Sequence, residues 1–170
     1  EEAYEELSGS ARAGRDFAEA IMTTDTRVKQ TIRRIEIGGE EVVIAGAVKG
    51  AGMIGPNMAT TLCFITTDAM IGKGQLKKAM RRAVGRSLNR LTVDGHQSTN
   101  DTAVVLSSAK AGNKAIKAGS KDYRKFEAGL AEVCEDLVCQ MALDAEGATR
   151  MFWVVVKGAA SGAEARKAAR

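Results

Sequence analysis

The sequence predicts an α/β protein, a layered sandwich of mixed β-sheets with flanking helices. Two observations support this class. Short apolar runs of strand length occur beside longer segments whose apolar residues recur at helical spacing. The predicted strands are also separated by a hairpin as well as by helices, which favours a layered sandwich over a strictly alternating βαβ chain. With 170 residues, the chain is long enough to bury a proper core.

The first third of the chain predicts one helix and one hairpin. Residues 11–22 (ARAGRDFAEAIM) have the pattern of a short helix. Residues 31–48 have the pattern of a β-hairpin, in which Gly38 and Gly39 supply the turn and residues 42–48 return as a buried strand.

The middle of the chain predicts two strands around a helix. Residues 62–65 and 103–106 are short and strand-like, residues 72–91 have helical periodicity, and residues 92–102 form a turn-rich connection. The apolar stripe of this helix consists of Leu76, Met80, Val84, Leu88 and Leu91, and the basic residues off the stripe are Lys77, Lys78, Arg81 and Arg82.

The last third predicts a helix over residues 122–143 and a strongly β-forming run over residues 151–156. Ser161 and Glu164 then have the spacing of a capping box, and the helix that they begin has no stop signal before the last residue. Because an initiator methionine is also missing, we expect both termini to be truncated and residues 1–170 to be one partial domain.

Composition and charge argue against several classes of protein. Hydrophobic residues make up 45% of the chain, too many for a disordered protein, and no apolar run approaches the roughly 20 residues of a membrane span. The net charge of +4 comes largely from residues 72–91 and the C-terminal tail. Aromatic residues, which stack on nucleic-acid bases, are absent from residues 72–91. We therefore expect a solvated basic helix face, with neither nucleic acid nor a membrane as a partner.

The cysteines and the N-terminal residues indicate the kind of cellular compartment in which the protein works. Cys63, Cys134 and Cys139 are odd in number and lie in apolar or helical surroundings, which suits a reducing compartment better than a disulfide framework. The acidic start, EEAYEELSGS, lacks the basic region and apolar stretch of a signal peptide.

Residues Gly50–Gly55 spell a G-x-G-x-x-G motif directly after a predicted strand. A dinucleotide-binding turn needs its third glycine to open a helix that holds the pyrophosphate. Here Pro56 follows and the next regular element is a strand, so the match is weak. A nucleotide-binding module that uses Gly50–Gly55 stays as an alternative.

Two threonines, Thr60 and Thr61, precede the strand at residues 62–65. They are typical of the start of a strand, but a threonine can also be a nucleophile. Sites of the Ser-His-Asp kind would need the single histidine, His96, which lies in a polar turn-rich segment. An N-terminal threonine needs no histidine, because its own α-amine, with a pKa of about 7.7–8.0, can accept the hydroxyl proton. For Thr60 this requires cleavage of the Ala59–Thr60 bond.

Four stretches of the sequence resemble segments of one known protein family. KGAGMIGPNMAT (49–60) resembles the self-cleavage segment of the ornithine acetyltransferases, the bifunctional glutamate N-acetyltransferases of arginine biosynthesis. AEAIMTTDT (18–26), TVDGHQSTNDT (92–102) and DAEGAT (144–149) agree in the same order. The similarity covers essentially the whole chain, and it corresponds to the middle of the family's chain.

The resemblance implies a sandwich of the N-terminal-nucleophile kind and a precursor that cleaves itself before a threonine. Residues 1–59 would be the end of an α chain and residues 60–170 the start of a β chain, commonly in an α2β2 assembly. The implied reaction moves the acetyl group of N2-acetyl-L-ornithine to L-glutamate, and some members also use acetyl-CoA. No cofactor is implied, and the implied location is the cytoplasm, or the mitochondrial matrix in a eukaryote.

The resemblance also assigns residues. Thr60 corresponds to the nucleophile and Ala59 to the new α-chain terminus, while Thr23, Lys49 and Glu146 correspond to substrate-contacting positions. Substrates with a carboxylate and an ammonium group are complemented by a lysine and a glutamate, and which meets which stays open. Without the resemblance, these three would be read as a capping hydroxyl, a surface lysine at a strand end and part of a helix-terminal turn.

The sequence departs from the family pattern at three positions. Thr61 stands where many members have an apolar residue, Gly55 where alanine is frequent, and His96 where an acidic residue is usual. The family's oxyanion-hole donors lie upstream of residue 1, and losing one such donor costs about 10²–10³ in rate. We therefore expect negligible activity from residues 1–170 alone. An N-terminal-nucleophile aminopeptidase or amidase on the same scaffold is a further alternative.

Overall fold

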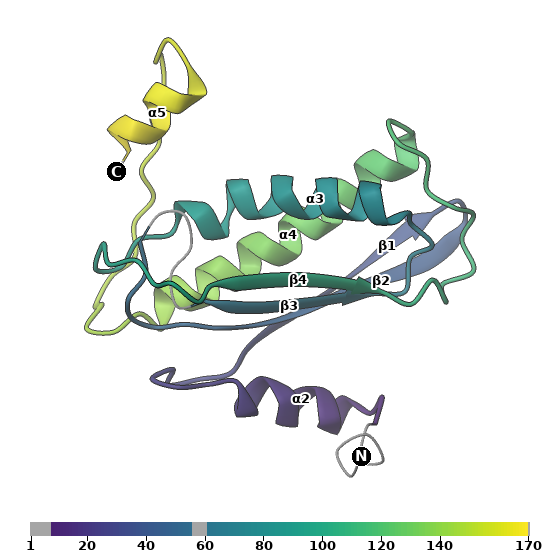
Figure 1. The fold of residues 1–170 in the computed structure, drawn as a ribbon, viewed down its shortest axis with the longest axis horizontal. Coiled ribbons are helices and arrows are strands. Elements are labelled where there is room, and N and C mark those ends of the chain that lie inside the picture. Colours follow the sequence, from purple (N-terminus) through teal and green to yellow (C-terminus); the bar gives the residue numbers. More distant parts are fainter. Residues whose placement is uncertain (1–7, 56–60, 170) are drawn as a thin grey trace.

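The computed structural model describes residues 8–55 and 61–169. These residues form a four-stranded mixed sheet with helices on both faces (Figure 1). In chain order the elements are α2 (Ala11–Ala20), β1 (Lys29–Ile37), β2 (Glu40–Lys49), β3 (Leu62–Thr67), α3 (Lys73–Arg86), the 3₁₀ turn η1 (Leu88–Arg90), β4 (Thr102–Ser107), α4 (Lys121–Leu143) and α5 (Gly162–Ala168). The predicted α/β class with a mixed sheet and flanking helices is confirmed.

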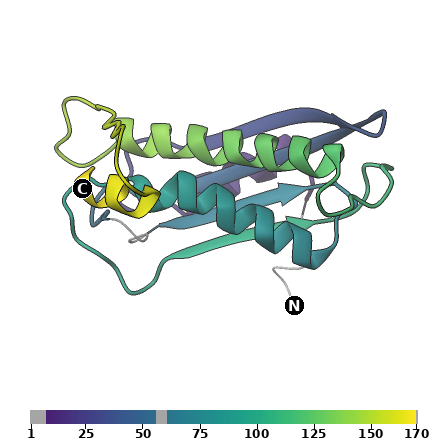
Figure 2. The ribbon, with the colours of Figure 1, turned by 90° about the horizontal axis from the view of Figure 1, so that it is seen from above.

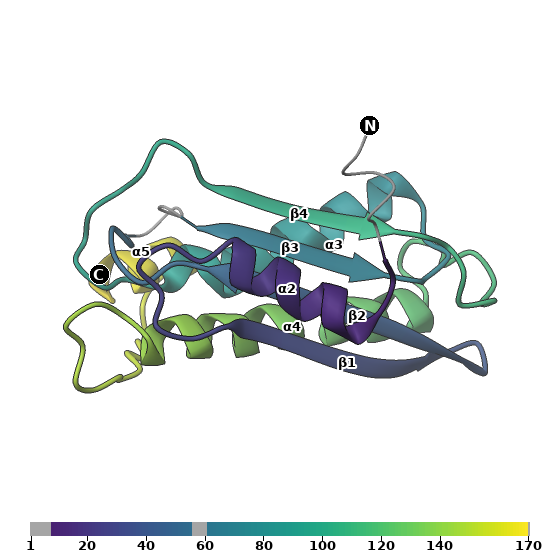
Figure 3. The same cartoon turned by 90° about the horizontal axis from the view of Figure 1, so that it is seen from below.

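The helices form two layers around the sheet. Figure 2 shows α3 and α4 side by side over one face, and Figure 3 shows α2 across the opposite face. On the more open face, Phe17 of α2 meets Phe64 of β3 edge to face, with ring centroids 5.2 Å apart. The helix begins where Ser10 accepts a hydrogen bond from the Ala13 N–H.

The strand order is β1-β2-β3-β4. The predicted hairpin is confirmed: β1 and β2 are antiparallel, and Gly38 and Gly39 take the positive φ angles, 62° and 89°, that the tight turn requires. β2 and β3 are also antiparallel, whereas β3 and β4 are parallel and are therefore joined by a long crossover that contains α3.

The register of the sheet gathers several chain segments at one end. Lys49 at the end of β2 lies opposite Leu62 at the start of β3, and Leu62 lies opposite Thr102 at the start of β4. Lys29 at the start of β1 lies opposite Val48. The loop after β2 and the connections that enter β1, β3 and β4 therefore meet at this end of the sheet.

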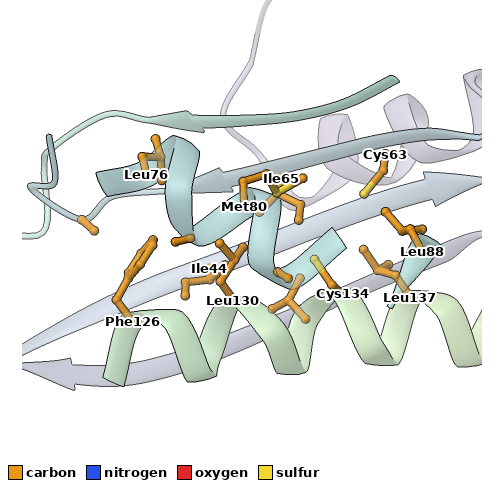
Figure 4. Close-up of a cluster of buried hydrophobic side chains, with 14 of the residues drawn as sticks. Ile44, Cys63, Ile65, Leu76, Met80, Leu88, Phe126, Leu130, Cys134 and Leu137 are labelled. Atoms are coloured by element: carbon orange, nitrogen blue, oxygen red, sulfur yellow. The ribbon is translucent and has the colours of Figure 1, made fainter. Parts of the chain in front are cut away.

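The main core lies between the sheet and the two long helices (Figure 4). On α4, the side chains of Phe126, Leu130 and Leu137 recur at helical spacing and are fully buried against Ile44 and Ile65 of the sheet. Burial of each such side chain contributes about 1.5–3 kcal/mol, so this face fixes the position of α4 and of the residues that follow it.

The predicted helix over residues 72–91 is shorter in the structure. α3 ends at Arg86, and Ser87 leaves the helical conformation with φ −124° and ψ −92°. The Ser87 hydroxyl donates to the Ala83 carbonyl at 2.7 Å, and Leu88 continues into the core from the 3₁₀ turn. The serine thus ends the helix, although the apolar stripe continues past it. The basic residues of α3 are exposed, as expected.

The predicted strand over residues 151–156 is wrong, because these residues form no strand in the structure. Phe152 and Trp153 are 82% and 67% exposed. A strand needs a neighbour to receive its backbone hydrogen bonds, and within residues 8–55 and 61–169 this run pairs with no strand. β propensity alone therefore does not make this run a strand.

The predicted capped helix start near the C-terminus is confirmed, since the Ser161 hydroxyl accepts from the Glu164 N–H at 3.2 Å. The helix ends at Ala168 rather than at the last residue. Across the described part of the chain, each helix is too short or too polar to cross a bilayer.

Candidate active site

Two of the predicted substrate-contacting residues touch. Thr23 follows α2 and Lys49 ends β2, and the Lys49 Nζ donates a hydrogen bond to the Thr23 Oγ1 at 3.3 Å. Lys49 is only 7% exposed, whereas Thr23 is exposed, so the contact lies at the rim of the sheet's end. The structure therefore brings together two positions that are 26 residues apart in sequence.

Glu146 contacts the glycine-rich loop that follows Lys49. The Glu146 N–H donates to the Ala51 carbonyl at 2.9 Å. Its carboxylate lies directly over Gly52, where a Cβ would come within 2.4 Å of Oε2. A side chain at position 52 would therefore require the flexible Glu146 carboxylate to move aside. Among the described residues no hydrogen bond or ion pair joins Glu146 to Lys49.

Thr60 and Ala59 lie outside the described residues. Thr61, the next residue, is 2% exposed and enters β3. Its N–H donates to the Asp101 Oδ1 at 2.8 Å, and its carbonyl accepts from the Thr102 N–H at 2.9 Å. Its Oγ1 lies 3.5 Å from where a Cβ on Gly50 would be. Thr61 therefore lies beside the residue that follows Lys49.

A buried ion cluster lies beneath this site, and the sequence analysis did not predict it. The Lys29 Nζ is 2.5 Å from the Asp25 Oδ1 and 2.5 Å from the Asp144 Oδ2, and none of the three side chains is more than 1% exposed. Each carboxylate of the cluster is two residues from a predicted substrate contact: Asp25 follows Thr23, and Asp144 precedes Glu146.

Asp25 connects the ion cluster to the backbone beside Lys49 and to the backbone of Thr23. Its Oδ1 also accepts from the Gly50 N–H at 2.7 Å, and its Oδ2 accepts from the Thr23 N–H at 3.2 Å. Burial by itself would raise the pKa of Asp25, but the hydrogen bonds from Gly50, Lys29 and Thr23 outweigh burial and hold the pKa below its usual value. The carboxylate stays charged and fixes the backbone beside both Thr23 and Lys49.

Asp144 is the second anchor of the cluster. It caps the C-terminal end of α4, accepts from the N–H and the hydroxyl of Thr26, and is 3.4 Å from the Arg27 Nε. Burial opposes its charge, yet the hydrogen bonds from Lys29 and Thr26 hold the pKa of Asp144 well below its ordinary range. The start of the Glu146 turn is thus tied to the start of β1.

One signal in the sequence could have identified this cluster. Side chains in a strand alternate between two faces, and Lys29 has the same parity as Ile35 and Ile37, which face the core. Burying a lysine on the core face of a strand costs free energy that a carboxylate beside it offsets. Asp25 and Asp144 both lie inside segments that the sequence analysis had singled out.

The glycine loop does not present its backbone to a phosphate group. The N–H groups of Met53 and Ile54 both donate to the carboxylate of Asp94, at 2.6 and 3.0 Å. These hydrogen bonds, together with one from the His96 N–H, outweigh the effect of burial and lower the pKa of Asp94. An internal carboxylate thus occupies backbone donors that a nucleotide would need.

Neither metal ligands nor a thiolate is available in the described part of the chain. No group of three or more His, Cys, Asp or Glu residues there could hold a metal ion. Burial raises the pKa of Cys134 to about 12 and that of Cys63 higher still. These thiols stay protonated and unreactive at neutral pH. His96 lies on the surface, 3.5 Å from Asp94.

Comparison with known proteins places the chain in a family. Residues 1–170 match the model of the ArgJ family. The arginine biosynthesis bifunctional protein ArgJ of Symbiobacterium thermophilum is 53% identical over 161 residues, which are 95% of this chain and 40% of that protein. The ArgJ protein of Bacillus licheniformis is 48% identical over 160 residues, which are 94% of this chain and 39% of that protein.

A crystal structure of the ArgJ protein of Bacillus halodurans is also similar, with 44% identity and a TM-score of 0.49, over 51% of this chain and 41% of that chain. The chain thus spans about 40% of the length of the curated relatives that it matches.

Proposed function

The chain belongs to the ArgJ family, and from that premise we propose that it is the central part of an acetyltransferase of arginine biosynthesis. The proposed reaction transfers the acetyl group of N2-acetyl-L-ornithine to L-glutamate, with acetyl-CoA as a further possible donor. The active form is made by cleavage of the Ala59–Thr60 bond, so that residues 1–59 end one chain and residues 60–170 begin another.

The chemistry uses a threonine as the carrier of the acetyl group. The Thr60 Oγ attacks the acetyl carbonyl carbon of N2-acetylornithine, and the bond from that carbon to the ornithine nitrogen breaks. The nitrogen takes a proton and ornithine leaves as an amine, while the acetyl group stays on Thr60 as an ester. The amine of glutamate then attacks the ester, and the threonine hydroxyl is restored. The free α-amine of Thr60 accepts and returns the proton.

The observation that supports this proposal most directly is the state of Lys49. It is a buried cation whose hydrogen bond goes to a neutral hydroxyl, and in the described residues it forms no ion pair. A buried charge is costly unless an opposite charge is close. Both proposed amino-acid substrates carry an α-carboxylate that meets this need. Glu146, whose exposed carboxylate lies over Gly52, complements the side-chain ammonium of ornithine.

The assembly and location of the protein belong to the same proposal. The two chains stay together as an α2β2 heterotetramer, and the protein works in the cytoplasm. We expect residues 1–170 alone to have negligible activity, because the family's oxyanion-hole residues correspond to positions upstream of residue 1.

Intact-mass measurement of a full-length protein that contains this chain tests the proposal. We expect two chains that meet at Ala59 and Thr60, and a single uncleaved, inactive chain for Thr60→Ala. Assays with N2-acetylornithine plus glutamate, and with N2-acetylornithine in water alone, then separate transfer from hydrolysis. Acetate release without N-acetylglutamate would identify an amidase instead, and full activity from an uncleaved chain would overturn the mechanism.

A further inference from the structure

The segment over residues 92–102 carries a family resemblance but has no part in the proposed reaction. In the fold it connects η1 to β4 and runs beside the loop that follows β2. The Val93 N–H donates to the Ile54 carbonyl at 2.9 Å. At its other end, the Thr102 N–H donates to the Thr61 carbonyl at 2.9 Å. One connection thus contacts the chain on both sides of residues 56–60.

Asp94 binds the backbone on the N-terminal side of residues 56–60. Its Oδ2 accepts from the Met53 N–H at 2.6 Å, and its Oδ1 accepts from the Ile54 N–H at 3.0 Å. Met53 has a φ of 53°, in the left-handed region that costs free energy for a residue with a side chain. The two hydrogen bonds to one carboxylate hold the backbone in this conformation.

Gly55 shows how closely the two backbones approach. A Cβ at this position would lie 2.9 Å from the carbonyl carbon and oxygen of Gly95, and 3.0 Å from the carbonyl oxygen of His96. Backbone atoms cannot move aside as a flexible side chain can. Gly55 is therefore packed directly against residues 92–102.

Asp101 binds the backbone on the C-terminal side of residues 56–60. Its Oδ1 accepts from the Thr61 N–H at 2.8 Å, and Thr61 is buried at the start of β3. Two aspartates of a single connection therefore fix the backbone on the two sides of the segment that contains Ala59 and Thr60.

We propose that Asp94 and Asp101 are positioning residues for the self-cleavage that activates the protein. The inference rests on the proposed function, because it concerns the proposed Ala59–Thr60 bond. In that cleavage the bond from the Ala59 carbonyl carbon to the Thr60 nitrogen breaks. Water supplies the oxygen that completes the Ala59 carboxylate and the hydrogen that completes the Thr60 amine. Fixing the backbone of Met53, Ile54 and Thr61 lowers the conformational entropy that must be lost to reach the attack geometry.

The two aspartates differ in what they do after cleavage. Met53 and Ile54 then belong to the chain that ends at Ala59, so the hydrogen bonds of Asp94 no longer act on Thr60. Thr61 stays covalently attached to Thr60, so Asp101 continues to hold the residue next to the nucleophile. Loss of Asp94 should therefore slow cleavage alone, whereas loss of Asp101 should slow cleavage and also lower kcat for acetyl transfer.

Cell-free synthesis of the full-length protein, with timed quenching and separation of precursor from product chains, measures the cleavage rate. Asp94→Ala and Asp101→Ala should cleave about 10-fold to 100-fold more slowly than the unaltered protein. The matched control is Asp68→Ala. Asp68 accepts from the Val43 N–H at 2.8 Å, beyond the opposite end of β3. This variant loses the same kind of bond and should cleave at the unaltered rate.

The cleavage rates of conservative variants distinguish a positioning role from a general loss of stability. An amide keeps one acceptor oxygen, and Asp101 uses one oxygen for Thr61, so Asp101→Asn should cleave at nearly the unaltered rate. Asp94 uses both oxygens, so Asp94→Asn loses one bond and should stay slow.

The outcomes separate this inference from the proposed function. Cleavage of both alanine variants at the unaltered rate, or equal slowing of Asp68→Ala, would overturn the positioning role while leaving the transferase standing. An unaltered protein that never cleaves yet transfers acetyl groups would overturn both. If the alanine variants do not fold, the two asparagine variants decide, and equal cleavage rates for them would reject the inference.

Discussion

Two lysines at the same end of the sheet are both buried, and they differ in what compensates their charge. Lys29, at the start of β1, is 2.5 Å from each of two buried carboxylates. Lys49, at the end of β2, donates to the hydroxyl of Thr23 and, within the described ranges, makes no ion pair. Burial of a charge therefore does not by itself identify a binding residue. The absence of a counter-charge beside a buried cation is the more informative feature.

The difference assigns different roles to the two residues. Lys29 holds together segments that are far apart in sequence, since Asp25 and Asp144 are both attached to it. Its electrostatic interactions are complete within the protein. Lys49 is adjacent to the same cluster through the Asp25–Gly50 hydrogen bond, which fixes the backbone beside it. We propose that its ammonium group meets a substrate carboxylate.

The largest effect is expected for Lys29→Met. The substitution leaves Asp25 and Asp144 as buried carboxylates without their cation, so the free energy of unfolding of the full-length protein should fall by about 3–5 kcal/mol. Lys49→Met is the matched control, because it removes a buried lysine that has no carboxylate partner. Chemical denaturation of both variants measures the contrast. Equal losses of stability would contradict it.

The next effect is on substrate binding by Lys49→Met. A hydrogen bond to a charged group contributes about 1.5–3 kcal/mol, so the KM for N2-acetylornithine should rise about 10-fold to 100-fold. Stability should change little. Steady-state kinetics at saturating glutamate measure the change, and Lys77→Met, on the exposed face of α3, should leave KM unaltered. An unchanged KM for Lys49→Met would remove this residue from the site.

The acid dependence of stability should separate the two lysine sites in a further way. The pKa values of Asp25 and Asp144 are lower in the folded protein than in the unfolded chain. Their stabilisation is present above the ordinary carboxyl pKa of about 3.9 and is lost as the pH falls through the folded values, because the unfolded state then binds more protons.

Thermal unfolding between neutral and strongly acidic pH checks this expectation. Asp144→Asn should flatten the decline of Tm at low pH, because one of the two titrating carboxylates is gone. Lys49→Met should retain the full decline. A decline that is identical in all three proteins would show that other carboxylates dominate acid unfolding.

The smallest effect is expected for Glu146→Gln. Glu146 is exposed, so neutralising it should raise the KM for N2-acetylornithine by about 10-fold or less and leave stability unchanged. The KM for glutamate, which has no side-chain ammonium, should change less. Comparison of the two KM values tests the assignment of Glu146 to the ornithine ammonium, and equal changes would argue against it.

Much of the fold could be predicted from local patterns. The hairpin of β1 and β2 was predictable because two glycines provide the turn, and α4 because its apolar residues recur at helical spacing over its whole length. Local patterns did not predict the secondary structure where contacts with residues distant in sequence determine it. Residues 151–156 have strong β propensity but no pairing strand among the described residues, and the helix predicted over residues 72–91 ends early at Ser87.

The candidate site was predictable only in part. Motif resemblance gave Thr23, Lys49 and Glu146, and the structure shows the first two in contact and the third against the adjoining loop. The ion cluster, and the hydrogen bonds of Asp94 and Asp101 to the residues before and after 56–60, were not predicted. Their hydrogen bonds and ion pairs join residues up to 118 positions apart, and no spacing rule reaches that far.

The sequence by itself determined the α/β class, the order of the main elements and the family to which the chain belongs. These depend on periodicity, turn residues and motifs, which are local properties of the chain. The tertiary structure alone decided that Lys29 has two carboxylates beside it while Lys49 has none among the described residues, because an ion pair depends on distance in space and not on separation in sequence. It also decided that residues 92–102 contact the chain on both sides of residues 56–60, since β3 and β4 pair in parallel and begin at the same end of the sheet.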